Sequence, residues 1–492
     1  MTYKPFRLGS RKHVFVDWNL IEPGYGLSFG GQRPESWEMP YGVRLRAHRP
    51  RLDRIPLVTA DKPWEAGNAR TGLGVYSTLL EDEGRWRLYY DSGDLSGELE
   101  VDEDVGTQRV MAYAESSDGI HWVKPELGTV TYRGSRRNNL VFGLDASPGR
   151  DAHGATFFKD PSAPPSERYK MVHLGSHQGR FCIYGALSSD GLRWKLIREP
   201  LIRNYLSDTQ SVVDFDPERN VYVGYFRGWT AHEHGTSHAR RIISYAETDR
   251  FEHWPTPRPL VGIDMHDGPD TDIYTNSYAR WPGADAHLMF PAFYRHSGDF
   301  SEVHLMTSRD GLNWQRPLRQ PIIPAGEPGS EAEGGAYAGC GLGGLTPGEW
   351  SLPYSPRRGS HNQLFFDNSR PETGVLTASW RRDGFVSLEA ETLGGCSTLI
   401  LSLGGSRLVL NAWTRFGGEI RVELADASRD NRRTHAPALP GRSFKDCDPI
   451  TGDHLDRTVT WRGESDLSAW RGRPVRLRFR MRRARLYSLR SV

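Results

Sequence analysis

The stretch Ala112–Trp122 reads AYAESSDGIHW, and the chain returns to this wording twice with little change. The close copies are YGALSSDGLRW at Tyr184–Trp194 and LMTSRDGLNW at Leu305–Trp314. Two weaker copies are SYAETDRFEHW, ending at Trp254, and ASWRRDGFVSLE, ending at Glu389. A spacing of roughly 60–70 residues between copies is typical of propellers, solenoids and arrays. One aspartate marks each copy: Asp118, Asp190, Asp249, Asp310 and Asp383.

Each copy has the same local pattern. A short alternating strand leads into Ser-Asp-Gly or Arg-Asp-Gly, and the next strand opens on tryptophan. Asp-Gly favours a tight turn because glycine tolerates a positive φ. Upstream of each copy lies another strand, polar turn and strand, and the five upstream segments are Gly74–Asp91, His153–Leu174, Asp208–Arg227, Asp272–His296 and Gly329–Pro356.

Two hairpins per repeat make a four-stranded sheet, and five such sheets predict a five-bladed β-propeller over residues 56–385. Residues 1–55 indicate an irregular N-terminal arm with a few strands. From residue 386 to 492, short alternating strands separated by glycine-rich turns predict a β-sandwich. The expected fold class is therefore all-β, a five-bladed β-propeller followed by a C-terminal β-sandwich.

Composition excludes several function classes. The chain has 492 residues and a net charge of +2, so no long-range field favours nucleic acid or an anionic membrane. An arginine-rich segment near the C-terminus alternates with Val475, Leu477, Phe479 and Met481, which predicts a half-buried strand with an arginine-rich outer face. No apolar run approaches the roughly 18 residues of a membrane span, and the N-terminus has no apolar signal region. We expect a cytoplasmic protein without membrane or nucleic-acid partners, and homo-oligomer formation remains open.

The metal-binding residue types form no metal-site pattern. The four cysteines make no CxxC pair, so reduced structural thiols are expected. The tract HEHGTSH, with His232, His234 and His238, lies in a loop without matching cysteines or acids. A loop at the rim of the propeller that touches substrate explains it better than a metal site. No cofactor and no metal are expected.

Acidic residues stand where the inner strands of the propeller begin. In a propeller these starts converge near the axis, and carboxylates crowded there repel unless water, a cation or a cationic side chain intervenes. Such crowding suits paired-carboxylate chemistry, in which one group stays protonated and the other ionised. Capping of a turn is the alternative for any single acid. The candidates are Asp208, Asp272, Glu331 and Glu333, with Asp151 and His153 on the second blade and Asp61, Glu65, Asn68 and Arg70 on the first.

Three of these acids form the predicted catalytic set. Glu333 is the expected general acid, because its glycine neighbours leave few charges to solvate the carboxylate. Asp208 is the expected nucleophile or base, and Asp272 the group that steadies positive charge at the anomeric carbon. Glu331 is the rival for the acid, since it lies on the same strand face as Glu333. Substrate contacts are expected from Asp61, Trp64, Glu65, Arg70, His153, Arg227, Trp229, Tyr274, Asn276, His296 and Glu331.

The repeats YAESSDGIHWVKP and LMTSRDGLNWQRP resemble the S-x-D-G-x-x-W hairpins of the five-bladed propeller glycoside hydrolases. That group includes invertases and inulinases, levansucrases and arabinanases, and a propeller followed by a sandwich resembles its invertase–inulinase branch. The invertase motif W-x-N-D-P-N-G is absent. The segment FKDPSAP at Phe158–Pro164 resembles the Arg-Asp-Pro of invertases, with Lys159 in place of arginine, but it is expected to be a surface turn. The resemblance implies a divergent glycoside hydrolase or transglycosidase acting on a carbohydrate, with furanosides among the candidates.

Two other functions remain open. A propeller phosphorylase would cleave a glycoside with inorganic phosphate, for which Arg227, Arg240, Arg241 and His296 would supply cations. A carbohydrate-binding propeller without chemistry would use the same surface without turnover. Assays with and without phosphate distinguish these three functions.

Overall fold

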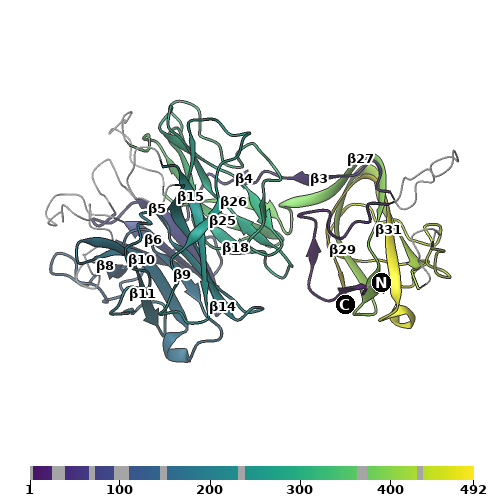
Figure 1. Ribbon diagram of the computed structural model, residues 1–492, viewed down its shortest axis with the longest axis horizontal. Helices are drawn as coiled ribbons and strands as arrows, with labels where there is room; N and C mark the ends of the chain where they lie inside the picture. The colour runs from purple at the N-terminus through teal and green to yellow at the C-terminus, as the bar shows by residue number, and fades with distance from the viewer. Residues whose placement is uncertain are drawn as a thin grey trace.

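The computed structural model describes residues 4–24, 39–65, 73–92, 110–143, 152–230, 239–362, 374–428 and 436–492. Strands prevail throughout these ranges, and the helical segments in them are single 3₁₀ turns at Pro165–Glu167 and Ser468–Trp470. No helix within the described ranges has the length and apolar character to cross a bilayer. The all-β class is confirmed. Figure 1 shows two bodies side by side, with strands β3 and β27 running between them.

The larger body contains the predicted repeats as antiparallel sheets. The first three sheets have four strands each, in the order of the sequence or its reverse. This order is that of propeller blades built from two consecutive hairpins. The strands are β5 (Leu73–Asp82), β6 (Arg85–Ser92), β7 (Val110–Ser116) and β8 (Leu140–Gly143); β9 (Thr156–Lys159), β10 (Tyr169–His177), β11 (Arg180–Ser188) and β12 (Lys195–Leu196); and β13 (Val212–Asp216), β14 (Val221–Trp229), β15 (Arg241–Thr248) and β16 (Arg258–Val261).

The fourth repeat is split between two sheets. Its strands break midway, so that one half forms a four-stranded sheet and the other half joins the fifth repeat in a seven-stranded sheet. The four-stranded half contains β18 (Tyr278–Arg280), β19 (His287–Met289), β22 (Met306–Ser308) and β23 (Trp314–Gln315). The seven-stranded sheet contains β17 (Thr271–Thr275), β20 (Ala292–Arg295), β21 (Phe300–Val303), β24 (Gly335–Ala338), β25 (Glu349–Arg357), β26 (Leu376–Arg381) and β4 (Arg51–Leu52).

Two features arrange these sheets as a propeller. Strand β4, from the N-terminal arm, pairs with β26, so the start of the chain completes the last sheet. The first strands of the sheets also converge, because residues of β5, β9, β13 and β18 and the segment just after β24 line a single hollow of about 210 Å³. The predicted residues Asp208 and Asp272 are not among the residues that line this hollow, since Asp208 lies just before β13 and Asp272 near the start of β17.

The Ser-x-Asp-Gly-x-x-Trp repeats form one turn that recurs with the same hydrogen bonds. In the first copy, Oδ1 of Asp118 accepts the N–H groups of Ile120 and His121 at 2.8 Å, while Ser116 Oγ accepts the N–H of Gly119. The glycine has φ = 76°. The copies at Asp190 and Asp310 repeat these contacts. The turn is longer than the tight hairpin expected, because the carboxylate caps two further residues before the outer strand begins.

The smaller body is one eight-stranded sheet. Its longest strands cross the whole body and change direction at bulges, at Ala390/Leu393 and at Thr414/Glu419. The N-terminal arm contributes three of its strands, so residues 1–55 serve both bodies. The strands are β1 (Phe6–Leu8), β2 (His13–Val14), β3 (Arg44–Ala47), β27 (Val386–Ser397), β28 (Leu401–Leu403), β29 (Leu408–Asp426), β30 (Asp453–Thr458) and β31 (Pro474–Ser491).

Strand β31 has the predicted alternation, with one correction. Val475, Leu477, Phe479 and Met481 are buried in the core of this body. The arginine-rich outer face holds for Arg480, Arg482 and Arg483, which are exposed, but Arg476 and Arg478 are buried and pair with Glu22 and Glu423 at 2.8 Å. The arm and the segment after β29 cover this part of the strand. The four cysteines are free and buried: Cys182, Cys340, Cys396 and Cys447.

Candidate functional site

Asp208 lies just before β13, and its environment is set by two neighbouring blades. Its carboxylate forms an ion pair with Arg227, near the end of β14. Its backbone carbonyl accepts a hydrogen bond from Nε2 of His153 at 2.8 Å. The side chain of Asp208 is 41% exposed, whereas that of Arg227 is 3% exposed. The carboxylate is therefore accessible while its cationic partner is fixed in the protein.

Asp272, on β17, is the buried counterpart. The residue is 3% exposed, and Oδ2 lies 2.9 Å from Nε2 of His296 and 3.2 Å from Nη1 of Arg241. Arg240 Nη1 lies 3.8 Å from Oδ1. Three cationic or basic groups thus surround one carboxylate, which compensates for its loss of hydration.

Two arginines lie between two aromatic rings, and we call Arg227, Trp229, Arg241 and Tyr274 the arginine–aromatic cluster. The Arg227 guanidinium lies 5.2 Å from the ring centres of both Trp229 and Tyr274. The Arg241 guanidinium lies 5.7 and 5.0 Å from the same centres. Burial, together with the positive charge of Arg241, lowers the pKa of Arg227. The cluster joins Asp208 to Asp272 across blades three and four.

Several buried polar atoms around the cluster have no hydrogen-bond partner within the described residues. Buried polar groups in proteins are ordinarily paired, so such a concentration requires an explanation. These atoms lie just before β13, at the end of β14, at the start of β15, and along and just after β17. The atoms are Oδ1 of Asp272, both amide atoms of Asn276, Oγ1 of Thr209 and Thr275, Oε1 of Gln210, Nε of Arg227 and Arg241, and Nε1 of Trp229. The hydroxyl and ring oxygens of a sugar are suitable partners for this mixture of donors and acceptors.

A second network adjoins the cluster. Tyr294 donates its hydroxyl to Asp299 Oδ1 at 2.7 Å, and Asp299 also accepts hydrogen bonds from the backbone and side chain of Asn362. The ring of His361 lies edge-on to Tyr274, with 4.4 Å between ring centres. Sequence reasoning missed Asp299, His361 and Asn362, because they follow no motif and meet only through the turn after β25.

The predicted residues of the first blade are not part of this site. Trp64 packs in the core between blades and donates Nε1–H to Asn139 at 2.8 Å. Glu65 is completely buried and accepts hydrogen bonds from Tyr90 and Lys124 at 2.6 and 2.7 Å. Asp61 also pairs with Lys124, at 2.6 Å. These contacts hold the segment before β5 in place, and the predicted Arg70 lies outside the described residues.

Glu331 and Glu333 are both exposed in the turn before β24. Glu333 accepts a hydrogen bond from the N–H of Gly329 at 2.7 Å, and Glu331 pairs with Arg358 at 3.1 Å. The expected poorly solvated environment of Glu333 is wrong, because its side chain is exposed in this turn. Its role as general acid stays a prediction without that support.

The Glu333→Gln variant tests this role directly. Loss of a general acid slows a substrate with a poor leaving group far more than one with a good leaving group. Because Glu333 is solvated, we expect kcat on both substrates to stay within about threefold of wild type. Glu331→Gln tests the rival acid in the same two assays. A fall of about 10²-fold or more confined to the poor leaving group would restore Glu333 as the acid.

The invertase-like FKDPSAP segment is a structural turn, as expected. Asp160 Oδ1 accepts the backbone N–H of Ser162 at 2.8 Å, and its Oδ2 pairs with Lys170 at 3.1 Å and accepts the Tyr222 hydroxyl at 2.5 Å. Lys159 binds Asp82 on the adjacent blade. The tract with His232, His234 and His238 and the candidates Asn68 and Asp151 lie outside the described residues. In the ranges that the structure describes, no group of three or more His, Cys, Asp or Glu could hold a metal ion.

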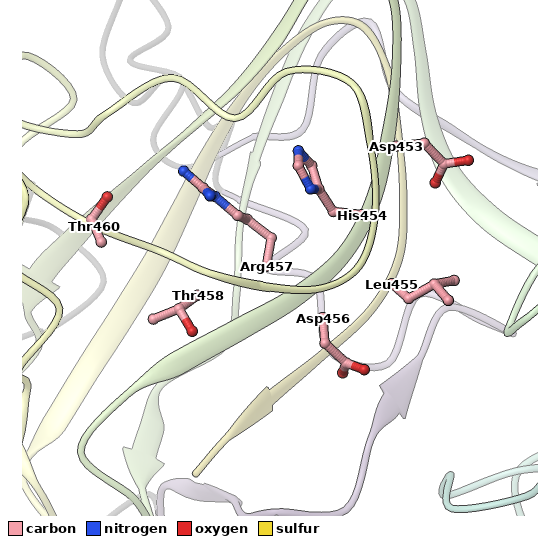
Figure 2. Close-up of a pocket in the computed structure, with 7 residues that line it drawn as sticks. All are labelled: Asp453, His454, Leu455, Asp456, Arg457, Thr458 and Thr460. Atoms are coloured by element: carbon pink, nitrogen blue, oxygen red, sulfur yellow. The ribbon is translucent and has the colours of Figure 1, made fainter. Parts of the chain in front are cut away.

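A hollow of about 580 Å³ lies away from this site, on strand β30 of the smaller body. Figure 2 shows the side chains of β30 and of Thr460, just beyond it, pointing in different directions. Its charged groups serve the fold, since Asp453 pairs with Arg381 at 2.5 Å and Asp456 with Arg490 at 2.7 Å. Volume alone therefore does not mark the functional site of this protein.

No protein-family model and no curated protein matches the sequence. Solved structures with a similar chain path include a β-1,2-mannobiose phosphorylase from Listeria innocua, with 11% identity, a TM-score of 0.45, and coverage of 70% of this chain and 98% of that one. An N-acetylgalactosamine deacetylase from F. plautii has 15% identity, a TM-score of 0.41 and coverage of 69% and 96%. A glycoside hydrolase has 13% identity, a TM-score of 0.43 and coverage of 68% and 92%. Such values are too low to transfer a reaction or a substrate.

Proposed function

We propose that this protein cleaves glycosidic bonds, as a hydrolase or transglycosidase, at the end of the propeller where the inner strands begin. The observation that carries the proposal is the convergence of two carboxylates, Asp208 and Asp272, on one arginine–aromatic cluster. Around it stand buried polar atoms that lack protein partners among the described residues. Aromatic faces and mixed polar groups are what a sugar ring needs for binding.

The two carboxylates have different roles in this proposal. Asp208 is the more accessible and acts as the nucleophile or base. Asp272, enclosed by Arg241 and His296, stabilises positive charge that develops at the anomeric carbon. A third group, protonated, would donate its proton to the oxygen of the leaving group. Glu333 or Glu331 would reach that oxygen only if the turn before β24 closes over the substrate.

The test is a screen of aryl glycosides, furanosides included, with and without inorganic phosphate. Turnover without phosphate that disappears in Asp272→Asn would support the proposal. Binding of sugars without turnover would assign the protein to carbohydrate recognition instead. No turnover and no binding across pentosides and hexosides would refute it.

Phosphorolysis is the second candidate, and the two neighbouring arginines favour it. Arg227 and Arg241 carry like charges close together, and an anion placed between them would relieve their repulsion. Arg240 and His296 lie beside the carboxylate of Asp272, which also pairs with Arg241. Strictly phosphate-dependent turnover, with a sugar phosphate as product, would select this function over hydrolysis.

The architecture belongs to the same proposal. We count β24, β25, β26 and β4 as a fifth blade, which makes the ring five-bladed, and we treat the bent eight-stranded sheet as the predicted sandwich. The absence of a net charge field and the reduced thiols agree with a cytoplasmic location. Activity on small soluble oligosaccharides would fit that location.

Trp229→Ala tests the sugar-stacking role of the cluster. Stacking binds substrate and transition state nearly alike, so KM should rise about tenfold while kcat changes less than threefold. The indole also packs against two arginines, so thermal stability must be measured beside the kinetics. A lower melting temperature with unchanged KM would assign Trp229 to packing.

A further inference from the structure

We propose that His361 is a specificity-determining residue, whose neutral imidazole donates its Nε2–H to an oxygen of the sugar bound at the arginine–aromatic cluster. The inference rests on the proposed function and assigns a donor that no sequence motif indicates. Four features of the structure support it: the place of the ring, its tautomer, its neutral charge and the rigidity of its support.

The ring lies against the cluster. Its centre is 4.4 Å from that of Tyr274 and 5.1 Å from that of Tyr294, with edge-to-face geometry in both cases. Tyr274 is the same ring that contacts the guanidinium groups of Arg227 and Arg241. His361 therefore borders the arginine–aromatic cluster through the ring of Tyr274.

The hydrogen bonds of the ring define its tautomer. Ser301 Oγ donates to the hydroxyl oxygen of Tyr337 at 3.0 Å, so the Tyr337 hydroxyl hydrogen is left to point at Nδ1 of His361, 2.7 Å away. An Nδ1 that accepts a hydrogen bond carries no proton, so a neutral imidazole has its proton on Nε2. No hydrogen bond of Nε2 occurs among the residues that the structure describes.

The surroundings keep the imidazole neutral. Burial lowers the pKa of His361 to about 4, and the positive charges of Arg241, Arg357 and Arg227 act in the same direction. Asp299 opposes them more weakly. The group is therefore a donor at neutral pH and not a cation.

The backbone holds the donor in place. The N–H of His361 donates to the carbonyl of Asp299 at 2.7 Å, and the N–H of Asn362 donates to the Asp299 carboxylate at 2.8 Å. Asp299 stands at the turn between β20 and β21, with φ = 53°. A donor fixed in advance loses little entropy on binding and rejects ligands that lack the matching oxygen.

Two substitutions separate the donor from the ring's structural role. A glutamine amide reaches the position of Nε2, whereas an asparagine amide reaches only that of Nδ1 and keeps the Tyr337 contact. On a substrate found in the glycoside screen, we expect His361→Asn to lower kcat/KM roughly 10- to 100-fold, mostly through KM. His361→Gln should stay within about fivefold of wild type. The melting temperature of His361→Asn should stay close to that of wild type, because this variant keeps the Tyr337 contact.

Each result decides a different claim. Equal activity of His361→Asn and wild type, or equal loss in both variants, would overturn the donor role and leave glycoside cleavage standing. If wild type turns over no glycoside, the proposed function fails and the donor role is tested by binding. Thermal shifts with arabinose, xylose, mannose, fructose and galactose would then have to appear in wild type and His361→Gln but not in His361→Asn, and any other pattern refutes it.

Discussion

Asp272→Asn should lower kcat by about 10³-fold or more on any glycoside that the protein cleaves. Asn keeps the size of the side chain but removes the charge that faces Arg241, His296 and Arg240. Without that charge nothing at this position stabilises an oxocarbenium-like transition state. KM should change little, because the loss falls on the transition state and not on ground-state binding.

The control for Asp272→Asn is the same substitution at Asp249, which is exposed in a turn at the far end of the third blade. Asp249→Asn should leave kcat and KM unchanged. Asp208→Asn should also lower kcat by about 10³-fold. On substrates with good leaving groups, this loss should be larger than the loss caused by removing a general acid. If Asp272→Asn lowers the melting temperature but keeps most of the activity, the carboxylate only balances the arginines and the catalytic set must be sought elsewhere.

The repeat motif allowed much of the fold to be predicted from the sequence. The motif specifies its own turn, since one carboxylate satisfies two backbone N–H groups and one hydroxyl satisfies a third. These contacts are local, so each copy is visible in the sequence. The division of the fourth repeat at Asn276 is not visible, because it depends on the neighbouring blades.

The site was predictable only where a residue's place in the repeat determines its place in space. Asp208 and Asp272 stand at equivalent strand starts, and the structure joins them through Arg227 and Arg241. Glu333 stands at a similar start, but its side chain is exposed in the turn before β24. His361 reaches the cluster through a contact with Asp299, 62 residues away in the sequence, and no local pattern indicates such a contact.

Asp383→Ala should destabilise the protein by about 3–5 kcal/mol. This aspartate is the last of the five repeat aspartates, and it is completely buried with φ = 61°. Its carboxylate accepts hydrogen bonds from Lys12 at 2.7 Å, from Trp281 at 3.1 Å and from Asn411 at 3.1 Å. These partners belong to the N-terminal arm, the propeller and the smaller body. Alanine would leave the Lys12 ammonium, which is 14% exposed, without its carboxylate.

Asp310→Ala is the matched control for Asp383→Ala, since it removes the same residue from an exposed copy of the turn and should cost only about 1 kcal/mol. Urea unfolding followed by tryptophan fluorescence measures both, with Trp281 in the junction. Deleting residues 386–492 should leave an insoluble or unstable propeller, because it removes Asn411 and Val386 and uncovers the core beside Phe385. If the truncated chain is soluble and fully active, or if the two aspartate variants are equally stable, the bodies do not depend on each other. The role of Asp383 would then be only to cap the turn of the fifth repeat, like the aspartates of the other copies.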